Sequence, residues 1–474
     1  MCAIMVKSME VENKNVAEKQ DDVARLVEVF DRMSPDDVID KFTPTNAVAA
    51  KQEFLANDTL RRPNNEYGNL TAESLTVLAQ DLATASGLIE AAAMNGIVKK
   101  IYEDEIGHYG ETLDFLMTAK QVQDNPDDVA GGGITEYMRL NEKLYGVPDE
   151  KVYRALLAEK MSKISVGALD ERCRQIWEEL NERVRFDPSD VGDKFVPRAD
   201  TVKFMGEMVR DFYGDLLKFV PEDPKNGDKF VASEVKQVFG DILSYLQEDS
   251  GFDERWKVVD KKSGAINVSA SDKAIYVPED RKPMSRSELE GLVVHEIGTH
   301  VYRAEIGEQM GVKPLAQGMT GYLDTEEGVA KVMEAAVKDR YVEAGVDLYL
   351  TAGMAYCENM DFRDVFETNW RMILLASDKS DFSDEAIGKA KNTAYVRTQR
   401  IFRGTDTLPW FKDLSYYNGG TDVWRYIEKE LDKDGGTATL FDELFLGGKN
   451  NVFDVEQQRA VSSVTWGGAK SGAL

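Results

Sequence analysis

The chain has 474 residues, of which 42% are hydrophobic and 9% aromatic, so it is long enough and apolar enough to fold around a substantial core. Its 85 acidic residues outnumber its 58 Lys and Arg residues, which gives a formal net charge of −27. Because such a surface repels phosphate backbones and anionic lipid headgroups, we expect no nucleic-acid partner and no membrane partner.

The cysteines and the first residues indicate where the protein resides. Cys2, Cys173 and Cys357 are odd in number and lack Cys-x-x-Cys spacing, which argues against a disulfide framework and a thiolate zinc site. The apolar start ends at Lys7, too early for the core of a signal peptide, and no segment approaches a membrane span. We therefore expect a cytoplasmic protein. The sequence does not predict its oligomeric state.

The first part of the chain reads as a tail followed by helices. Residues 1–20 are polar and of mixed charge, and we expect a disordered tail there. Residues 21–190 repeat apolar residues at three- and four-residue spacing, which predicts an N-terminal helical region. Turn-rich breaks at 61–69 and at Gly131–Gly133 separate its helices. These glycines lack the Lys-Ser/Thr of a phosphate-binding loop, so they predict a flexible connection.

A boundary segment rich in Pro and Asp introduces a second region, over residues 191–455. Residues 255–280 alternate and are rich in Val, Ile and Tyr, which predicts a small antiparallel sheet or hairpin. A helix over 285–307 follows at once, and another starts at Thr325, a plausible N-cap. Residues 456–474 are expected to form a frayed C-terminal tail. The predicted fold class is mainly α (α+β), with many helices and one small antiparallel sheet before the helix over 285–307, called the motif helix below.

Two of the three histidines fall within the window HEIGTH, at His295 and His300. Hydrolytic zinc sites use imidazoles plus a carboxylate and keep one position for water. Glu296 follows the first histidine, in the place of the general base of H-E-x-x-H enzymes. The window predicts one Zn²⁺ per chain, with Glu296 as the catalytic base. His108 has no histidine nearby in sequence, and we expect a structural or surface residue.

The spacing of the two histidines requires a distorted helix. Residues five positions apart differ by about 140° around a regular α-helix, so His295 and His300 would diverge. A π-type turn returns such a pair to one face, and π-bulges occur often at functional sites. Gly298 and Thr299 lie inside the window and are weaker helix formers than Ala or Leu. The sequence therefore predicts a local π-type turn in the motif helix.

The third metal ligand is expected from the later helix. Glu327 in the segment TEEG is the best candidate, because His-His-Glu zinc sites take their glutamate from a separate, later helix. Glu326, Asp324 and Glu334 compete on composition alone. Glu326 or Asp324 has an alternative role, which is to accept a hydrogen bond from a ligating imidazole.

These motifs resemble a known family. HEIGTH with Arg303, followed by T-E-E-G, is similar to the zinc carboxypeptidase family that includes the microtubule-associated tyrosine carboxypeptidases. Its bacterial relatives, flavohaemoglobin expression-modulating proteins, are named after a Q-E-G-L-A motif. Here that motif reads EEGVA, with Glu326 for Gln and Val329 for Leu. The segments KLYGVPD, RIFRG and KDLSYYNGG also look like family segments, so the resemblance spans residues 45–430.

The resemblance implies a zinc-dependent exopeptidase with ligands His295, His300 and Glu327 and with Glu296 as the catalytic residue. We therefore predict that residues 191–455 form the zinc peptidase catalytic region. An enzyme of this kind needs a cation for the free C-terminal carboxylate of its substrate, since an unpaired charge in a cleft is costly. The candidates are Arg303, Arg400 and Arg403, because a guanidinium suits a bidentate carboxylate contact.

Two further substrate contacts are expected. Tyr416 or Tyr417 is a candidate donor to the oxyanion that develops during hydrolysis. The alternating segment over 265–277 is a candidate edge strand that pairs with an extended peptide.

The predicted function is removal of a C-terminal residue, such as tyrosine or another aromatic, from a peptide or protein. The family acts on tubulin, whose acidic tail a chain of charge −27 would repel, so we expect a different C-terminus. Two alternatives stay open: a regulatory or interaction protein that retains the zinc-site fold, and a zinc hydrolase acting on other amides.

Overall fold

The structure is a computed structural model. It describes residues 21–468, apart from gaps at 34–36, 127–131, 185, 188–194, 226, 263, 378–381 and 434–435. The tail predicted for residues 1–20 lies outside the described residues. Within the described ranges, no helix has both the length and the apolar character needed to cross a membrane.

The N-terminal part is a series of helices, as its periodicity predicts. After a helix over 21–32 come α2 (Asp37–Lys41), α3 (Ala47–Ala56), α4 (Ala72–Ala91), α5 (Gly96–Asp124), α6 (Gly133–Tyr145), α7 (Glu150–Ser162), η1 (Val166–Ala168) and α8 (Glu171–Arg183). Polar side chains start several of them. Thr71 and Ser74 form a capping box at α4, and the side chains of Asn95, Asp149 and Asp170 accept backbone N–H bonds at α5, α7 and α8.

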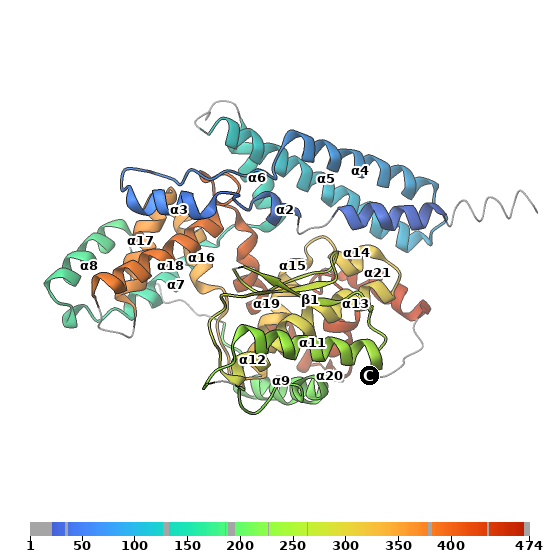
Figure 1. The fold of residues 1–474 in the computed structure, drawn as a ribbon. Helices are drawn as coiled ribbons and strands as arrows, with labels where there is room; N and C mark the ends of the chain where they lie inside the picture. Colours follow the sequence, from blue (N-terminus) through green and yellow to red (C-terminus); the bar gives the residue numbers. More distant parts are fainter. Residues whose placement is uncertain are drawn as a thin grey trace, which may run out of the picture.

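The second part holds a small sheet surrounded by helices (Figure 1). Before the sheet come α9 (Ala199–Phe212), α10 (Gly214–Leu217) and α11 (Ala232–Asp249). After it come α12 (Arg286–Leu292), η3 (Val293–Val301), α13 (Tyr302–Gln309), α14 (Lys313–Gln317), α15 (Tyr322–Ala336), α16 (Val346–Cys357), α17 (Phe362–Leu375), α18 (Asp384–Phe402), η4 (Phe411–Leu414), α19 (Ser415–Leu431), α20 (Gly436–Phe441), η5 (Asp442–Leu446) and α21 (Val455–Gly468). The mainly helical fold class is confirmed.

The sheet has three strands in the order β1-β3-β2: β1 (Lys257–Lys261), β2 (Asn267–Ser269) and β3 (Ala274–Pro278). β2 and β3 pair antiparallel as predicted, but β1 and β3 pair parallel, so the sheet is mixed. Alternation of side chains reveals which residues face a core but not the direction in which two strands pair. β3 is the mostly buried central strand, and β2 lies at an edge.

Three hydrophobic cores join parts that are distant in sequence. The first lies within the second part and surrounds α9, α11, the sheet, the motif helix and α15. The second joins α7 and α8 to α16, α17 and α18, which lie together in Figure 1. The third joins α4, α5 and α6 to Val312, Leu315 and Trp410. Two of the three cores therefore combine residues from both sides of the predicted boundary near residue 190.

The C-terminal segment differs from the expectation. Instead of a frayed tail from residue 456, α21 extends from Val455 to Gly468 and packs against α5. Val461 on α21 is buried in the third core, which explains why the segment is helical. Residues 469–474 lie outside the described residues.

Candidate active site

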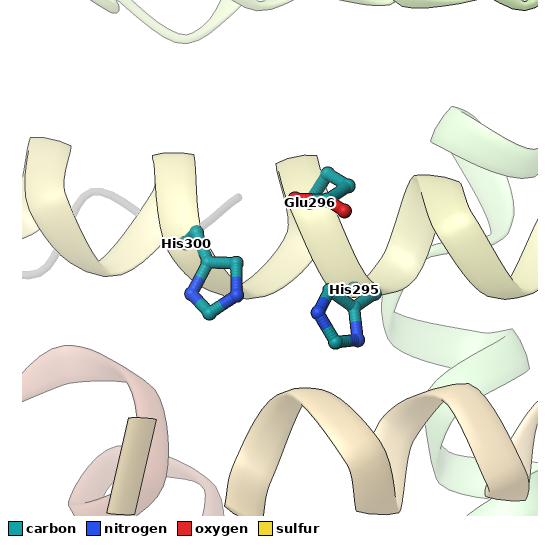
Figure 2. Close-up of side chains that lie close together, drawn as sticks. All are labelled: His295, Glu296 and His300. Carbon is teal, nitrogen blue, oxygen red and sulfur yellow. The ribbon is translucent and has the colours of Figure 1, made fainter. Parts of the chain in front are cut away.

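The motif helix contains the distortion that the histidine spacing predicts. α12 runs directly into η3, a π-helix from Val293 to Val301, and continues as α13. In a π-helix each backbone N–H bonds to the carbonyl oxygen five residues earlier, whereas in an α-helix it bonds to the one four residues earlier. His295 and His300 therefore project from the same side of the helix, as Figure 2 shows. The prediction of a π-type turn is confirmed.

Two hydroxyl groups support this turn. Thr299 Oγ1 donates a 3.1 Å hydrogen bond to the carbonyl oxygen of Val294, five residues earlier. Tyr213, which directly follows α9, donates a 2.6 Å hydrogen bond to the carbonyl oxygen of Gly298. Backbone carbonyls whose regular α-helical partners are displaced thus gain side-chain donors. Gly298 and Thr299 were expected to permit the distortion, and Thr299 actively stabilises it.

His295, Glu296 and His300 form a compact buried group. One potential ligand atom from each residue lies within 4.8 Å of the others, and the two imidazole rings are 5.0 Å apart between centroids. All three side chains come from the π-helix, so one local distortion brings them together (Figure 2).

Glu326 on α15 fixes the orientation of His300. Its Oε1 lies 2.8 Å from Nδ1 of His300, and its Oε2 accepts a 2.7 Å hydrogen bond from Nε of Arg303. Burial favours a higher pKa for Glu326, but the charges of Lys449, Arg303 and His300 lower that pKa well below its usual value. Glu326 is therefore an anion that holds His300 with Nε2 free, which is the role proposed for it as an alternative to metal ligation.

Glu334, about two turns after Glu326 on α15, lies beside His295. Its Oε2 is 3.3 Å from Nδ1 of His295, without the geometry of a hydrogen bond. Lys331 and Lys338 also pair with Glu334 at 2.9 Å. Burial favours a higher pKa for Glu334, but His295 and these two lysines lower it. The Nδ1 atoms of both histidines thus face carboxylates of α15.

Glu327 lies near this group without joining it. It lines the same cavity as both histidines, but it is absent from the cluster of described residues whose ligand atoms lie within 4.8 Å. Burial lowers the pKa of His300, but the charges of Glu326 and Glu327 raise it, and the net shift is upward. The charge of Glu327 is also the main cause that raises the pKa of Tyr416. The charge of Glu327 therefore acts on both His300 and Tyr416, which line the same cavity.

The group opens into a cavity of about 230 Å³. Its walls include Ile266, Asn267 and Val268 at the edge of the sheet, so the expected edge strand does border the site. Tyr416 also lines the cavity, whereas Tyr417 is buried and packs against Tyr349 with ring centroids 4.7 Å apart. Of the two tyrosines considered from sequence, only Tyr416 is therefore placed to meet a substrate.

None of the three arginines expected to bind substrate is among the described residues that line the cavity. Arg303 is 0% exposed, because it pairs with Glu326 and donates to backbone carbonyl oxygens, including that of Asn450 at 3.1 Å. Arg400 donates two hydrogen bonds, of 2.7 and 2.9 Å, to Asp413. Arg403 stacks 4.6 Å from the ring centroid of Trp410. These guanidinium groups stabilise the protein around the site.

Two lysines line the cavity instead, and sequence analysis missed both. Lys449 is nearly buried, and its Nζ lies 3.5 Å from Glu326 Oε1. Lys412 makes no ion pair with any residue that the structure describes, and its ammonium lies 5.9 Å from the Tyr416 ring centroid. Lys412 begins the segment KDLSYYNGG, whose likeness to a family segment is the signal that could have found it.

The donor types suit a metal ion. Imidazole nitrogens and carboxylate oxygens are the ligands of hydrolytic metal sites. His295, Glu296 and His300 each offer one such atom, and these atoms lie within 4.8 Å of one another. Carboxylates that face the second imidazole nitrogen are typical of metal-ligating histidines. His295 and His300 thus offer two nitrogens, with Glu296 and Glu327 as the nearby carboxylates.

Comparison with known proteins shows to which family the chain belongs. A search of curated proteins finds no match. The family model for microtubule-associated tyrosine carboxypeptidase matches residues 190–462, a segment that covers more than half of the chain and includes the π-helix and α15. The chain belongs to the microtubule-associated tyrosine carboxypeptidase family.

Proposed function

We propose that the protein is a zinc-dependent carboxypeptidase that removes a C-terminal residue from a peptide or protein. The observation that carries this proposal is the π-helix, which directs His295 and His300 to one side with Glu296 in the same buried group. Membership of a carboxypeptidase family supports the same reaction class.

The proposed ligands are Nε2 of His295, Nε2 of His300 and the carboxylate of Glu327. The Nδ1 atoms of both histidines face Glu334 and Glu326, so the Nε2 atoms are the ones left for a metal. Glu327 is preferred over Glu326, because Glu326 is already engaged by His300 and Arg303. This assignment requires the Glu327 carboxylate to approach the imidazoles when the metal binds.

A bound zinc ion supplies a positive charge that acidifies water and polarises the scissile carbonyl group. Glu296 is the proposed general base, which accepts the proton of the attacking water and transfers it to the departing amine. Tyr416 is the proposed oxyanion donor, because it lines the cavity beside the histidines and its hydroxyl is protonated at neutral pH; Glu327 and burial raise the pKa of that hydroxyl further.

Lys412 is the proposed partner of the substrate's terminal carboxylate, in place of the arginines. It lines the cavity, and no described acidic residue neutralises it in an ion pair. A charge-assisted hydrogen bond from such an ammonium favours substrates with a free C-terminus. The edge strand β2 is the proposed docking strand for the extended peptide, because it pairs only with β3 among the described strands.

For the substrate we propose a C-terminal tyrosine or another aromatic residue, on a tail less acidic than that of tubulin. The family name supports tyrosine, whereas the net charge of −27 disfavours an acidic tail. Zinc as the metal and a cytoplasmic location stay predictions.

Mass spectrometry of peptides with varied C-terminal residues tests the proposal. The wild-type protein is expected to release one C-terminal residue, to lose this activity with a chelator and to regain it with zinc. Glu296→Gln is expected to bind zinc but to lower kcat by at least a hundredfold. Equal turnover by wild type and Glu296→Gln, or intact peptides with both, would instead favour the interaction-protein alternative.

A further inference from the structure

One wall of the active-site cavity comes from helices that lie outside the family match. The matched segment begins at residue 190, yet α2, α5 and α6 all contribute side chains to the cavity. Those lining residues are Val38, Ile39, His108, Tyr109, Thr112, Leu144 and Tyr145. The site is therefore completed by a part of the chain that the family model does not describe.

This wall is held firmly against the rest of the site. Glu105, one turn before His108 on α5, accepts hydrogen bonds from the backbone N–H and the hydroxyl of Thr320, at 2.6 and 3.1 Å. Thr320 directly precedes Gly321, which lines the cavity. Tyr102, also on α5, accepts a 3.1 Å hydrogen bond from the backbone N–H of Lys313. The face of α5 that carries His108 is thus fixed relative to α15.

The side chains of this wall differ in charge from the other residues that line the cavity. Its members are aliphatic, aromatic or neutral polar, whereas the charged residues that line the cavity, Glu296, Glu326, Glu327, Lys412 and Lys449, all come from later segments of the chain. Tyr145 meets Trp410 edge to face, with ring centroids 5.7 Å apart. A charged side chain against this wall would lose hydration without gaining a partner, so the wall suits an uncharged one.

Two hydrogen-bonding groups in this part of the cavity have no partner among the described residues. Trp410 is 1% exposed, and its indole Nε1 has no acceptor within hydrogen-bond geometry, although it lies near enough to the Tyr145 hydroxyl to lower the pKa of that hydroxyl against the effect of burial. The ring of His108 is half-buried and makes no hydrogen bond to any residue that the structure describes, although its backbone carbonyl accepts one from Thr112. A buried polar group is normally satisfied, so the Trp410 Nε1 in the cavity lining indicates a ligand that supplies an acceptor, and the His108 nitrogens in the same lining are available to that ligand.

His108 offers both a donor and an acceptor. Burial lowers its pKa, an effect that outweighs the nearby charge of Glu111, while Lys143 lowers it further. Its imidazole is therefore neutral at neutral pH, with one N–H donor and one nitrogen acceptor. The structural or surface role expected from sequence stays a prediction, but the structure adds that all three histidines of the chain line one cavity.

We infer that the N-terminal helices, together with Trp410, form the side-chain recognition subsite of the enzyme, in which His108 and Trp410 select an uncharged side chain that carries a hydrogen-bonding atom. This inference rests on the proposed carboxypeptidase function. Through His108 it assigns part of the substrate selectivity to helices outside the family-matched segment, while Trp410 and the groups proposed for the chemistry lie inside that segment.

Selectivity ratios test this inference. The ratio of kcat/KM is measured for peptides that differ only in the C-terminal residue, in the pairs Tyr and Phe, and Gln and Glu. Wild type is expected to prefer the first member of each pair. His108→Leu and Trp410→Phe, which keep an apolar or aromatic wall but remove the polar atoms, are each expected to lower the Tyr/Phe ratio about tenfold, the effect of one net hydrogen bond.

Thr118→Val is the matched control. Thr118 also lies on α5 and donates to the Asp114 carbonyl oxygen at 2.8 Å, but it does not line the cavity, so its substitution should leave the ratio within twofold of wild type. Thermal melts and zinc content establish that all variants fold and hold metal. Unchanged Tyr/Phe ratios in both His108→Leu and Trp410→Phe would overturn the inference.

Binding separates this inference from the proposed function. The same peptide pairs are titrated calorimetrically into Glu296→Gln and into the double variants Glu296→Gln/His108→Leu and Glu296→Gln/Trp410→Phe. If wild type hydrolyses no peptide but the affinity ratio falls with the His108 or Trp410 substitution, the proposed function fails and the recognition subsite stands. If wild type hydrolyses peptides with ratios that neither substitution alters, the function stands and the subsite fails.

Discussion

The hydroxyl of Tyr213 donates a 2.6 Å hydrogen bond to the carbonyl oxygen of Gly298, inside the π-helix that carries both histidines. A Cβ atom on residue 298 would lie 2.9 Å from Cε1 of the Tyr213 ring, so glycine allows this approach. Tyr213 is buried in the first core, which ties the motif helix to α9. The geometry of the two imidazoles therefore depends on a side chain 85 residues away in sequence.

Tyr213→Phe tests that dependence. The substitution keeps the ring but leaves the Gly298 carbonyl without its donor, which costs about 1–3 kcal/mol of the free energy of unfolding. We also expect weaker zinc affinity, measured by competition with a chelator. Tyr302→Phe is the control, because Tyr302 is buried in the same core and its hydroxyl makes no hydrogen bond to a described residue. Equal effects of the two substitutions would contradict a role for the Tyr213 hydroxyl.

Glu326→Gln tests the orientation of His300. The amide retains an acceptor for His300 but loses the charge that pairs with the fully buried Arg303, so we expect zinc affinity to fall about 10–100-fold. Stability should fall as well, because Arg303 keeps its charge without a carboxylate partner. Glu290→Gln is the control, since Glu290 pairs with Arg286 and not with a histidine. Chelator competition on folded protein gives both affinities, and wild-type affinity in Glu326→Gln would refute the role of Glu326.

The π-helix could be predicted from the sequence, whereas the question of which glutamate of α15 faces which histidine could not. Two histidines five residues apart, with Gly298 and Thr299 between them, are incompatible with metal binding on a regular helix, so the spacing itself predicts the turn. Glu326 and Glu327 are adjacent and differ by about 100° around their helix. Which of them faces His300 depends on the rotation of α15, and that rotation is set by packing against α19 and the motif helix.

The roles of the cations were beyond local sequence for a related reason. Arg303 follows HEIGTH in the motif, but the buried carboxylate of Glu326 draws it into the core. The cavity wall around His108 depends on contacts between α5 and residues that follow it by more than 200 positions, such as Thr320. Periodicity predicted α5 as a helix, but it carries no information about which distant segment that helix meets.

Lys412→Met tests recognition of the substrate's carboxylate. Loss of one charge-assisted hydrogen bond is expected to lower kcat/KM about 10–100-fold for peptides with a free C-terminus. Peptides with an amidated C-terminus should react equally with wild type and variant, because they offer no carboxylate to Lys412. Lys433→Met is the protein control, since Lys433 is half exposed and pairs with Glu430 away from the cavity lining. Equal losses for free and amidated peptides would exclude this role for Lys412.

Glu105→Gln tests the protonation state of a buried carboxyl group on α5, one turn before His108. Burial raises the pKa of Glu105 to about 8, despite the hydrogen bonds from Thr320, which lower it. The folded protein therefore holds a proton that the unfolded chain releases above about pH 4.5, and the free energy of unfolding falls as pH rises from there to about 8.

Glu105→Gln lacks this ionisation, so its stability relative to wild type should improve by a few kcal/mol between pH 5 and pH 8. Urea denaturation at both pH values measures the change. Glu103→Gln, an exposed position on the same helix, is expected to track wild type. A Glu105→Gln difference that stays constant with pH would show that the carboxyl group is not held protonated.

The most direct test of the account is the zinc content of purified protein, measured by mass spectrometry of the metal. Wild type and Glu296→Gln are expected to hold one zinc ion per chain, whereas His295→Gln, His300→Gln and Glu327→Gln should hold almost none at equal chelator concentration. Wild-type protein without zinc, or full zinc content in the histidine variants, would contradict the claim that the π-helix of residues 293–301 is a metal site.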